Sequence, residues 1–160
     1  METPQIALQL YTVRELANDN FEGVVRQVAE MGYDGVEVAG FPGITPQEAA
    51  KLFSSLGLKA PSMHTAFPVG DQTNQVLDVA GILKCQYIVS GASPDDVSSM
   101  ENIQKYCDKV NEANQNARAN GFILGIHNHW WEYGKLSDKY VYQYLKEWIS
   151  PEVVFQIDTY

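Results

Sequence analysis

The sequence predicts a parallel α/β fold, and three observations carry that prediction. Short apolar runs alternate with longer amphipathic segments along all 160 residues. Motifs that start helices, and glycines that end them, lie at the borders of these segments. Six apolar runs and five helical segments follow one another in strict alternation. Such alternation is typical of a parallel sheet with right-handed crossover helices.

The predicted strands are the apolar runs. Short runs bounded by glycine or proline are typical of strands that are buried on both faces, as in parallel sheets. The six runs are Ile6–Tyr11, Gly35–Ala39, Leu58–His64, Gln86–Ser90, Phe122–His127 and Val153–Ile157.

The predicted helices lie between these runs, where apolar residues recur at helical spacing. Three such stripes are Phe21, Val24, Val25, Val28 and Met31; Ala49, Leu52, Phe53 and Leu56; and Ile103, Cys107, Val110, Ala113 and Ala117. Residues 45–48 (Thr-Pro-Gln-Glu) form a capping box with proline at the first helical position, and residues 93–96 have a related pattern. Gly32, Gly57 and Gly121 stand where a helix should end before a strand.

Two architectures fit this alternation, and chain length favours one of them. At about 29 residues per strand and helix, eight units would need about 235 residues, close to the ~250 of a (β/α)8 barrel. The 160 residues hold between five and six such units. On length alone, a doubly wound sheet is the better fit.

The residues at the strand ends favour the barrel. A barrel collects one or two functional side chains from the carboxyl end of every strand, whereas an open sheet needs them mainly at one switch point. Each predicted strand ends on or beside such residues: Gln9 and Tyr11, Glu37, His64, Ser90, His127 and His129, and Asp158. No glycine-rich phosphate loop follows the first strand. We therefore predict one incomplete domain of TIM-barrel type over residues 1–160, with about six of eight units.

Composition excludes several classes of function. The chain has 20 acidic and 11 basic side chains and a net charge of −9, which argues against binding to duplex nucleic acid or to an anionic membrane. The two cysteines, Cys85 and Cys107, are too few for a disulfide framework and are expected to be free thiols. No apolar run reaches the length of a membrane span. Residues 1–5 lack the features of a signal peptide, so a cytoplasmic location is the default expectation, compatible also with a signal peptide already removed.

The densest group of chemistry-bearing residues is the segment 127–132, His-Asn-His-Trp-Trp-Glu. His127 and His129 are two residues apart, so on a strand they point the same way. Two imidazoles and the carboxylate of Glu132 suit either metal binding or proton transfer, although a histidine pair can also be a plain hydrogen-bonded strand end. Trp130 and Trp131 follow directly and could form the wall of a sugar site.

Three further residues are weaker candidates when each is taken alone. Asp158 follows a buried strand, where an acid binds a metal, binds a ligand or caps a helix. His64 could be a satisfied structural group, and Glu37 could form a salt bridge at the rim of the sheet. Their common position at strand ends strengthens a functional reading of all three.

An ordered set of motifs resembles the xylose isomerase-like sugar phosphate isomerase/epimerase family. The motifs are IALQLYTVR at 6–14, VAEMGYDGVE at 28–37, HNH at 127–129 and FQIDTY at 155–160. The resemblance covers essentially the whole chain and implies a TIM barrel. It also implies a divalent metal, Mn²⁺ first with Mg²⁺, Co²⁺ or Zn²⁺ as alternatives, and a sugar as substrate.

The resemblance also assigns roles to residues. Asp158 matches the metal-binding aspartate of the sixth strand, and His127 occupies the position of the usual fifth-strand glutamate, which Glu132 could replace. The expected metal ligands are therefore His127, Glu132 and Asp158, and the expected catalytic residues are Glu132 and His129. The expected substrate-binding residues are Tyr11, Glu37, His64 and Trp130. The family's ligands on strands seven and eight have no counterpart within 160 residues, so metal binding is expected to be weak.

The function implied is metal-dependent isomerisation or epimerisation of a sugar or sugar phosphate, by proton transfer through an enediolate. The alternatives are a catalytically silent barrel fragment, the related apurinic endonuclease activity, which the charge of −9 disfavours, and a doubly wound binding domain. Runs 6–11 and 153–157 would also lack their barrel partners, so we expect a homo-oligomer, with a twofold dimer first, built through these edges.

Overall fold

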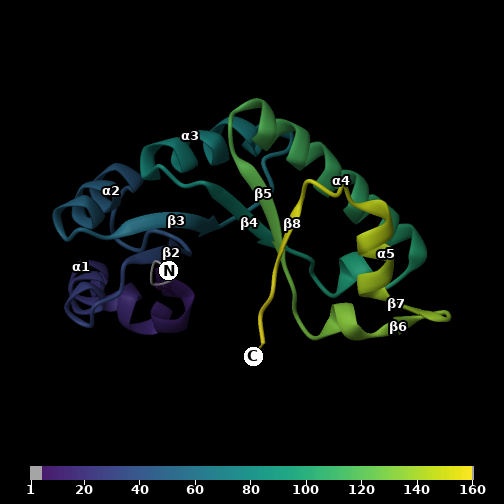
Figure 1. Ribbon diagram of the computed structural model, residues 1–160, viewed down its shortest axis with the longest axis horizontal. Helices are drawn as coiled ribbons and strands as arrows, with labels where there is room; N and C mark the ends of the chain where they lie inside the picture. The colour runs from purple at the N-terminus through teal and green to yellow at the C-terminus, as the bar shows by residue number, and fades with distance from the viewer. Residues whose placement is uncertain (1–4, 160) are drawn as a thin grey trace. The chain divides into compact units, whose positions relative to one another are not determined.

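The computed structural model describes residues 5–159 and confirms the predicted class, since the strands of the parallel sheet alternate with α-helices along that range (Figure 1). Contacts within the chain divide it into two compact units, which are described separately. Unit 1 comprises Met1–Thr65 and Asp78–Tyr87, and unit 2 comprises Ala66–Leu77 and Ile88–Tyr160. The expectation about the amino terminus rests mainly on residues 1–4, which lie outside the described residues, as does Tyr160.

Unit 1 contains the first three strands of the sheet. Strand β1 (Ala7–Gln9) pairs in parallel with β2 (Gly35–Val38), and β2 pairs in parallel with β3 (Lys59–His64). Helix α1 (Arg14–Glu30) connects β1 to β2, and helix α2 (Pro46–Ser55) connects β2 to β3. The apolar stripes of α1 and α2 are buried within the helices, as their spacing predicts, and Phe21 contacts Phe53 between them. The last residue of each predicted stripe lies just past its helix, where Met31 is exposed and Leu56 is half-buried.

The start of α2 confirms the capping box. The Thr45 hydroxyl accepts the backbone N–H of Glu48, and the Glu48 carboxylate accepts the backbone N–H of Thr45. The Glu48 carboxylate accepts hydrogen bonds from the Thr45 hydroxyl and from the Thr45 backbone N–H, and these lower the pKa of the Glu48 carboxyl because they favour its charged form. Gly57 adopts the left-handed backbone expected of a glycine just after a helix.

Unit 2 contains the remaining strands of the parallel sheet. Strand β4 (Tyr87–Gly91) lies beside β5 (Ile123–His127), and β5 pairs in parallel with β8 (Val154–Gln156). Helix α4 (Met100–Ala119) connects β4 to β5, and helix α5 (Val141–Trp148) precedes β8. Helix α3 (Thr73–Leu83) is divided between the two units. None of the helices among residues 5–159 is long and apolar enough to cross a bilayer.

Three local features differ from the prediction. The first strand is shorter than 6–11, because the chain turns into a 3-10 helix at Leu10–Val13 and buries Leu10. The 93–96 motif starts a short 3-10 helix (Asp95–Val97), and α4 begins later with Ser99 as its cap. A small hairpin of β6 (Lys135–Leu136) and β7 (Lys139–Tyr140) interrupts the segment before α5 and was not predicted.

Candidate functional site

The candidate site in unit 2 is built by the carboxyl ends of β5 and β8. Their parallel pairing places His127 opposite Gln156, so Asp158, two residues beyond, lies next to the end of β5. The segment that follows β5 turns through a 3-10 helix (Trp131–Tyr133) that contains Glu132. The structure therefore brings together four of the predicted site residues, His127, His129, Glu132 and Asp158.

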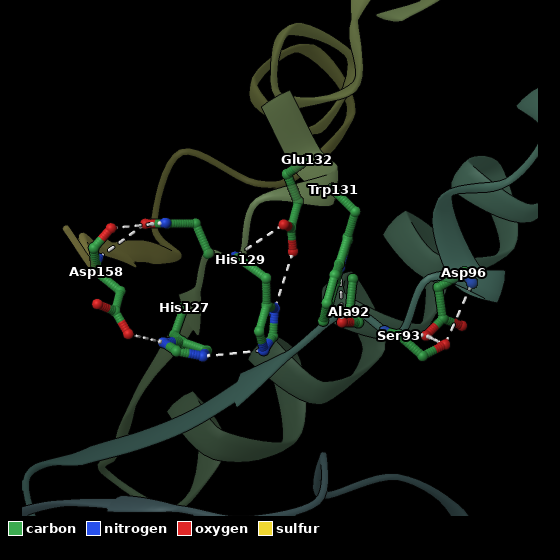
Figure 2. A network of polar contacts seen from close by, with 9 residues as sticks. Ala92, Ser93, Asp96, His127, His129, Trp131, Glu132 and Asp158 are labelled. Atoms are coloured by element: carbon green, nitrogen blue, oxygen red, sulfur yellow. Dashed lines mark hydrogen bonds and ion pairs between the residues drawn. The ribbon is translucent and has the colours of Figure 1, made fainter. Parts of the chain in front are cut away.

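These four side chains form a line of contacts (Figure 2). Asp158 Oδ2 lies 3.8 Å from His127 Nδ1, and His127 Nε2 lies 3.2 Å from His129 Nε2. His129 Nδ1 lies 3.3 Å from Glu132 Oε1. Each imidazole thus has a carboxylate on its Nδ1 side and the other imidazole on its Nε2 side.

Glu132 is held inside the protein. Its residue is only 2% exposed, and its Oε2 accepts the backbone N–H of His129 at 2.8 Å while Oε1 faces the ring. Both carboxylate oxygens are therefore directed at His129. Burial of Tyr106, together with the charge of Glu132, raises the pKa of the Tyr106 hydroxyl, so this phenol stays protonated.

The two tryptophans have different environments. Trp131 stacks on the His129 ring with centroids 4.0 Å apart, and its Nε1–H donates to the carbonyl of Ala92 at 3.1 Å. These contacts fix the ring plane of His129. Trp130 packs edge-to-face against Trp131 and is 80% exposed, so its face is available to a ligand.

Gly91, at the end of β4, provides the space in which the two imidazoles lie. A Cβ atom at this position would come within 2.9 Å of His129 Cε1 and 3.2 Å of His127 Cδ2. The backbone of β4 therefore contacts both rings directly, and this close approach requires glycine. This glycine was not identified as a site residue from the sequence.

The side of the site that faces α4 and α5 is packed. A cavity of about 10 Å³ remains there, lined by residues that include Tyr106, His127, Glu132 and Phe155. This volume accommodates at most one water molecule. A ligand larger than water can therefore reach His129 and Asp158 only from the solvent side, where their side chains are 30% and 42% exposed.

Unit 1 contains a separate polar group around Glu37. This residue is 5% exposed, and its two oxygens accept hydrogen bonds from Gln9 Nε2 and Ser62 Oγ, each at 2.6 Å. These hydrogen bonds satisfy the buried carboxylate. The charge of Glu37 also contributes to the raised pKa of Cys85 in the same unit, which burial chiefly raises to about 12.

The other predicted substrate-binding residues of unit 1 lie at its strand ends. His64 is the last residue of β3. Tyr11 lies in the 3-10 helix after β1, where it is exposed and contacts the Arg14 guanidinium at 4.3 Å from the ring centre. The roles predicted for Tyr11, Glu37, His64 and Trp130 remain predictions.

The fit to a divalent metal can be tested on the side chains of unit 2. Among residues 5–159, no three His, Cys, Asp or Glu side chains gather closely enough to hold a metal ion. The two carboxylates contact Nδ1 atoms, whereas the two Nε2 atoms lie side by side in the space left by Gly91. As they lie, the described side chains therefore do not form a metal-binding group, and the ligand roles predicted for His127, Glu132 and Asp158 remain predictions.

Comparisons by sequence give no match to a protein-family model and none to a curated protein. Comparisons of structure do find similar proteins. A sugar phosphate isomerase/epimerase from Parabacteroides distasonis matches with a TM-score of 0.80 at 17% identity, over 100% of this chain and 67% of that one. A D-allulose 3-epimerase from Methylomonas sp. matches with 0.64 at 17% identity, over 99% and 65%.

A family 2 AP endonuclease from Brucella melitensis also matches, with a TM-score of 0.69 at 14% identity, over 99% of this chain and 69% of that one. The chain thus spans about two thirds of the length of the structures it matches. These likenesses select the barrel over the doubly wound sheet. Over residues 5–159, the chain has the fold of the xylose isomerase-like TIM barrels, with six of the eight strands.

Proposed function

We propose that this chain carries the sugar-binding and proton-transferring part of a sugar isomerase or epimerase. The observation that supports this most directly is the line of carboxylate and imidazole groups at the ends of β5 and β8. In a TIM barrel, functional residues lie at the carboxyl ends of the strands. Two of the matched structures are named as a sugar phosphate isomerase/epimerase and a D-allulose 3-epimerase.

The reaction that this proposal assigns is transfer of a proton from a carbon next to a carbonyl, through an enediolate. A divalent metal, when bound, would polarise the carbonyl and the adjacent hydroxyl of the sugar and so acidify that carbon-bound proton. The described side chains form no group that could hold such an ion as they lie, so the residue roles proposed below do not depend on it.

Asp158 is the residue we propose as the base. Its carboxylate is the more exposed of the two in the site, and it can therefore reach a sugar on the solvent side. Glu132, the base suggested by its position in the sequence, is buried with both oxygens directed at His129. We therefore assign it a positioning role, in which it holds the orientation of the His129 ring.

The aromatic residues suit the substrate class. The exposed face of Trp130 offers a flat apolar surface to the C–H groups of a sugar ring. Trp131 contacts Trp130 and stacks on His129, and so holds the His129 ring in place. The AP endonuclease fold neighbour suggests a different substrate, but binding to a DNA backbone depends on neutralising phosphates. With 20 acidic and 11 basic residues, this chain is better suited to a small neutral sugar than to DNA.

Exchange of a substrate proton with solvent tests the proposal. The chain is incubated in D₂O with a panel of ketoses and their phosphates and a divalent metal, and deuterium at the carbon next to the carbonyl is followed by NMR. We expect incorporation with at least one sugar and at least a hundredfold less in Asp158→Asn. The matched control is Asp138→Asn, which changes an exposed aspartate in the β6–β7 turn. Absence of exchange with every sugar would favour the catalytically silent alternative.

A further inference from the structure

We propose that unit 2 has a second binding site, at the opposite end of β8 from Asp158, which takes a small neutral molecule rich in hydroxyl groups, such as a sugar or a polyol. The site is an open pocket of about 380 Å³ between the carboxyl-terminal half of α4 and the segment that leads from α5 into β8. In Figure 1, α5 lies beside α4 and the chain passes from α5 into β8. The proposal goes beyond the proposed function and does not rest on it.

The pocket is separate from the candidate site. Its residues in the second segment precede Val154, the first residue of β8, whereas Asp158 follows the last one. Its volume lies in the range of clefts that bind small molecules, whereas the cavity beside His127 accommodates at most one water molecule. Its lining is mostly polar and includes Asn111, Asn114, Gln115, Trp148, Ser150 and Glu152.

Asn114 carries the argument. It is 3% exposed and lies among the buried apolar residues of α4. Its Nδ2 is 3.5 Å from Glu152 Oε2, and its Oδ1 has no hydrogen-bond partner among residues 5–159. Exchanging the two amide atoms does not resolve this, because the carbonyl oxygen would then face the carboxylate. A buried acceptor without a donor costs stability, so a ligand that donates an O–H to Asn114 Oδ1 would recover that cost.

Asn111, one turn earlier on α4, provides the contrast. Its Nδ2 donates to the Trp148 carbonyl at 2.9 Å, and its Oδ1 accepts the Ser150 N–H at 2.8 Å. Both ends of this amide therefore hold residues 148–150 against the helix. The Trp148 ring also packs against Tyr144, with ring centres 5.4 Å apart. This wall of the pocket is fixed before a ligand binds, which lowers the entropic cost of binding.

Glu152 forms a wall that can move. Its Oε1 lies 2.9 Å from a guanidinium nitrogen of Arg118, and both side chains are about half exposed. An exposed ion pair of this kind contributes little to stability, so displacing the Glu152 side chain costs little. Because Asn114 Oδ1 is itself buried, a ligand has to displace this side chain, which contacts the same amide.

The charges favour a neutral hydroxylated ligand over a cation. The guanidinium of Arg118 already neutralises Glu152, so an ammonium group would have to compete with it. A hydroxyl can donate to Asn114 Oδ1 or to the carboxylate and can also accept from the guanidinium, whereas an ammonium group can only donate. The half-buried Trp148 ring lines the same pocket and offers an apolar surface to the C–H groups of such a molecule.

NMR of the nitrogen-15 labelled full chain tests the proposal on the unmodified protein. The chain is titrated with sorbitol, glucose and fructose, and separately with methylamine and putrescine as cationic probes. We expect the side-chain amide of Asn114 and the indole N–H of Trp148 to shift and to saturate with at least one hydroxylated probe below about 100 mM. Absence of any such shift, or tighter binding of an amine, would overturn the proposal. Shifts confined to the indoles of Trp130 and Trp131 would place the sugar at the candidate site and would also overturn it.

Asn114→Leu separates binding from a structural role. Leucine has a similar shape without polar atoms, so we expect at least tenfold weaker binding of the hydroxylated probe and an unfolding temperature that is equal or higher. The matched control is Gln104→Leu on the exposed face of α4, which should keep the affinity of the unmodified chain. Unchanged binding in Asn114→Leu, with a lower unfolding temperature, would show that Asn114 is a structural group and would overturn the proposal.

Discussion

The side-chain amide of Asn128 forms two reciprocal hydrogen bonds with the backbone of Asp158. Asn128 Nδ2 donates to the Asp158 carbonyl and Asn128 Oδ1 accepts the Asp158 N–H, each at 2.9 Å. The amide thus extends the pairing of β5 and β8 by one step beyond the last paired residues, His127 and Gln156. It fixes the backbone from which the Asp158 carboxylate reaches His127.

Replacing Asn128 with alanine should therefore loosen the end of β8. We expect Asn128→Ala to lower the free energy of unfolding by about 1–2 kcal/mol, because two backbone groups lose their partners at a partly exposed position. It should also weaken any activity that depends on Asp158. Urea unfolding measures the change in stability, with Asn120→Ala as the control, since the Asn120 amide makes one local hydrogen bond at a helix end. Equal stability changes in the two variants would contradict a special role for Asn128.

The sequence predicted most strands and the helices between them well, and it did not indicate the contacts between distant strand ends. Apolar runs and glycines after helices, such as Gly57, depend on local rules, and the structure confirms them. The Asn128–Asp158 contact joins residues 30 positions apart, so no local pattern indicates it. The β6–β7 hairpin was missed for a different reason, because each of its strands has only two residues and no periodicity can be detected.

Gly91→Ala should disturb the two imidazoles without unfolding the chain. The added Cβ would lie 2.9 Å from the His129 ring, and that ring cannot easily retreat because Trp131 and Glu132 hold it. We expect a loss of stability of about 1–3 kcal/mol, as for overpacking. Thermal unfolding measures this loss. The control is Gly81→Ala in α3, where a Cβ meets nothing within 4 Å, and a comparable loss of stability there would contradict the prediction.

The two cysteines should be unreactive in the folded protein. Burial raises the pKa of Cys85 and of Cys107 to about 12, with smaller contributions from the charges of Glu37 and Asp108. At pH 8 the reactive thiolate of each is then about a thousandfold less populated than in a thiol of ordinary pKa. We expect negligible labelling by a disulfide reagent at pH 8 and two labelled thiols in guanidinium. Labelling of one thiol in the native protein at the rate of a free thiol would contradict its buried position.

The site itself could be predicted as a set of residues but not as an arrangement. The spacing of His127 and His129 indicates that both point the same way, and the structure brings them together. Whether Glu132 faces a metal or the outer nitrogen of His129 depends on the 3-10 turn after β5, which no sequence pattern defines. Gly91 was missed because its role, a close approach of β4 to both rings, depends on a neighbouring strand.

Two variants of Glu37 distinguish a structural role of its carboxylate from a role in substrate binding. Its carboxylate is buried and accepts hydrogen bonds from Gln9 and Ser62, so Glu37→Ala should leave both donors without this acceptor. We expect that variant to lose about 2–3 kcal/mol of stability, the cost of unpaired buried polar groups. Glu37→Gln keeps the shape and one acceptor oxygen, and the Ser62 hydroxyl can rotate to accept from the new amide, so a loss below about 1 kcal/mol is expected.

The two variants together decide which interpretation of Glu37 holds. If Glu37 serves only the interior of unit 1, Glu37→Gln should exchange sugar protons at the rate of the unmodified chain. If it binds substrate as the resemblance implies, the KM for the sugar should rise at least tenfold in Glu37→Gln while the loss of stability stays below about 1 kcal/mol. Urea unfolding and a sugar-concentration series give both numbers from one preparation. A carboxylate oxygen accepts a hydrogen bond from a sugar hydroxyl, whereas the amide nitrogen of glutamine cannot. A raised KM with little change in stability would therefore indicate that Glu37 contacts the substrate.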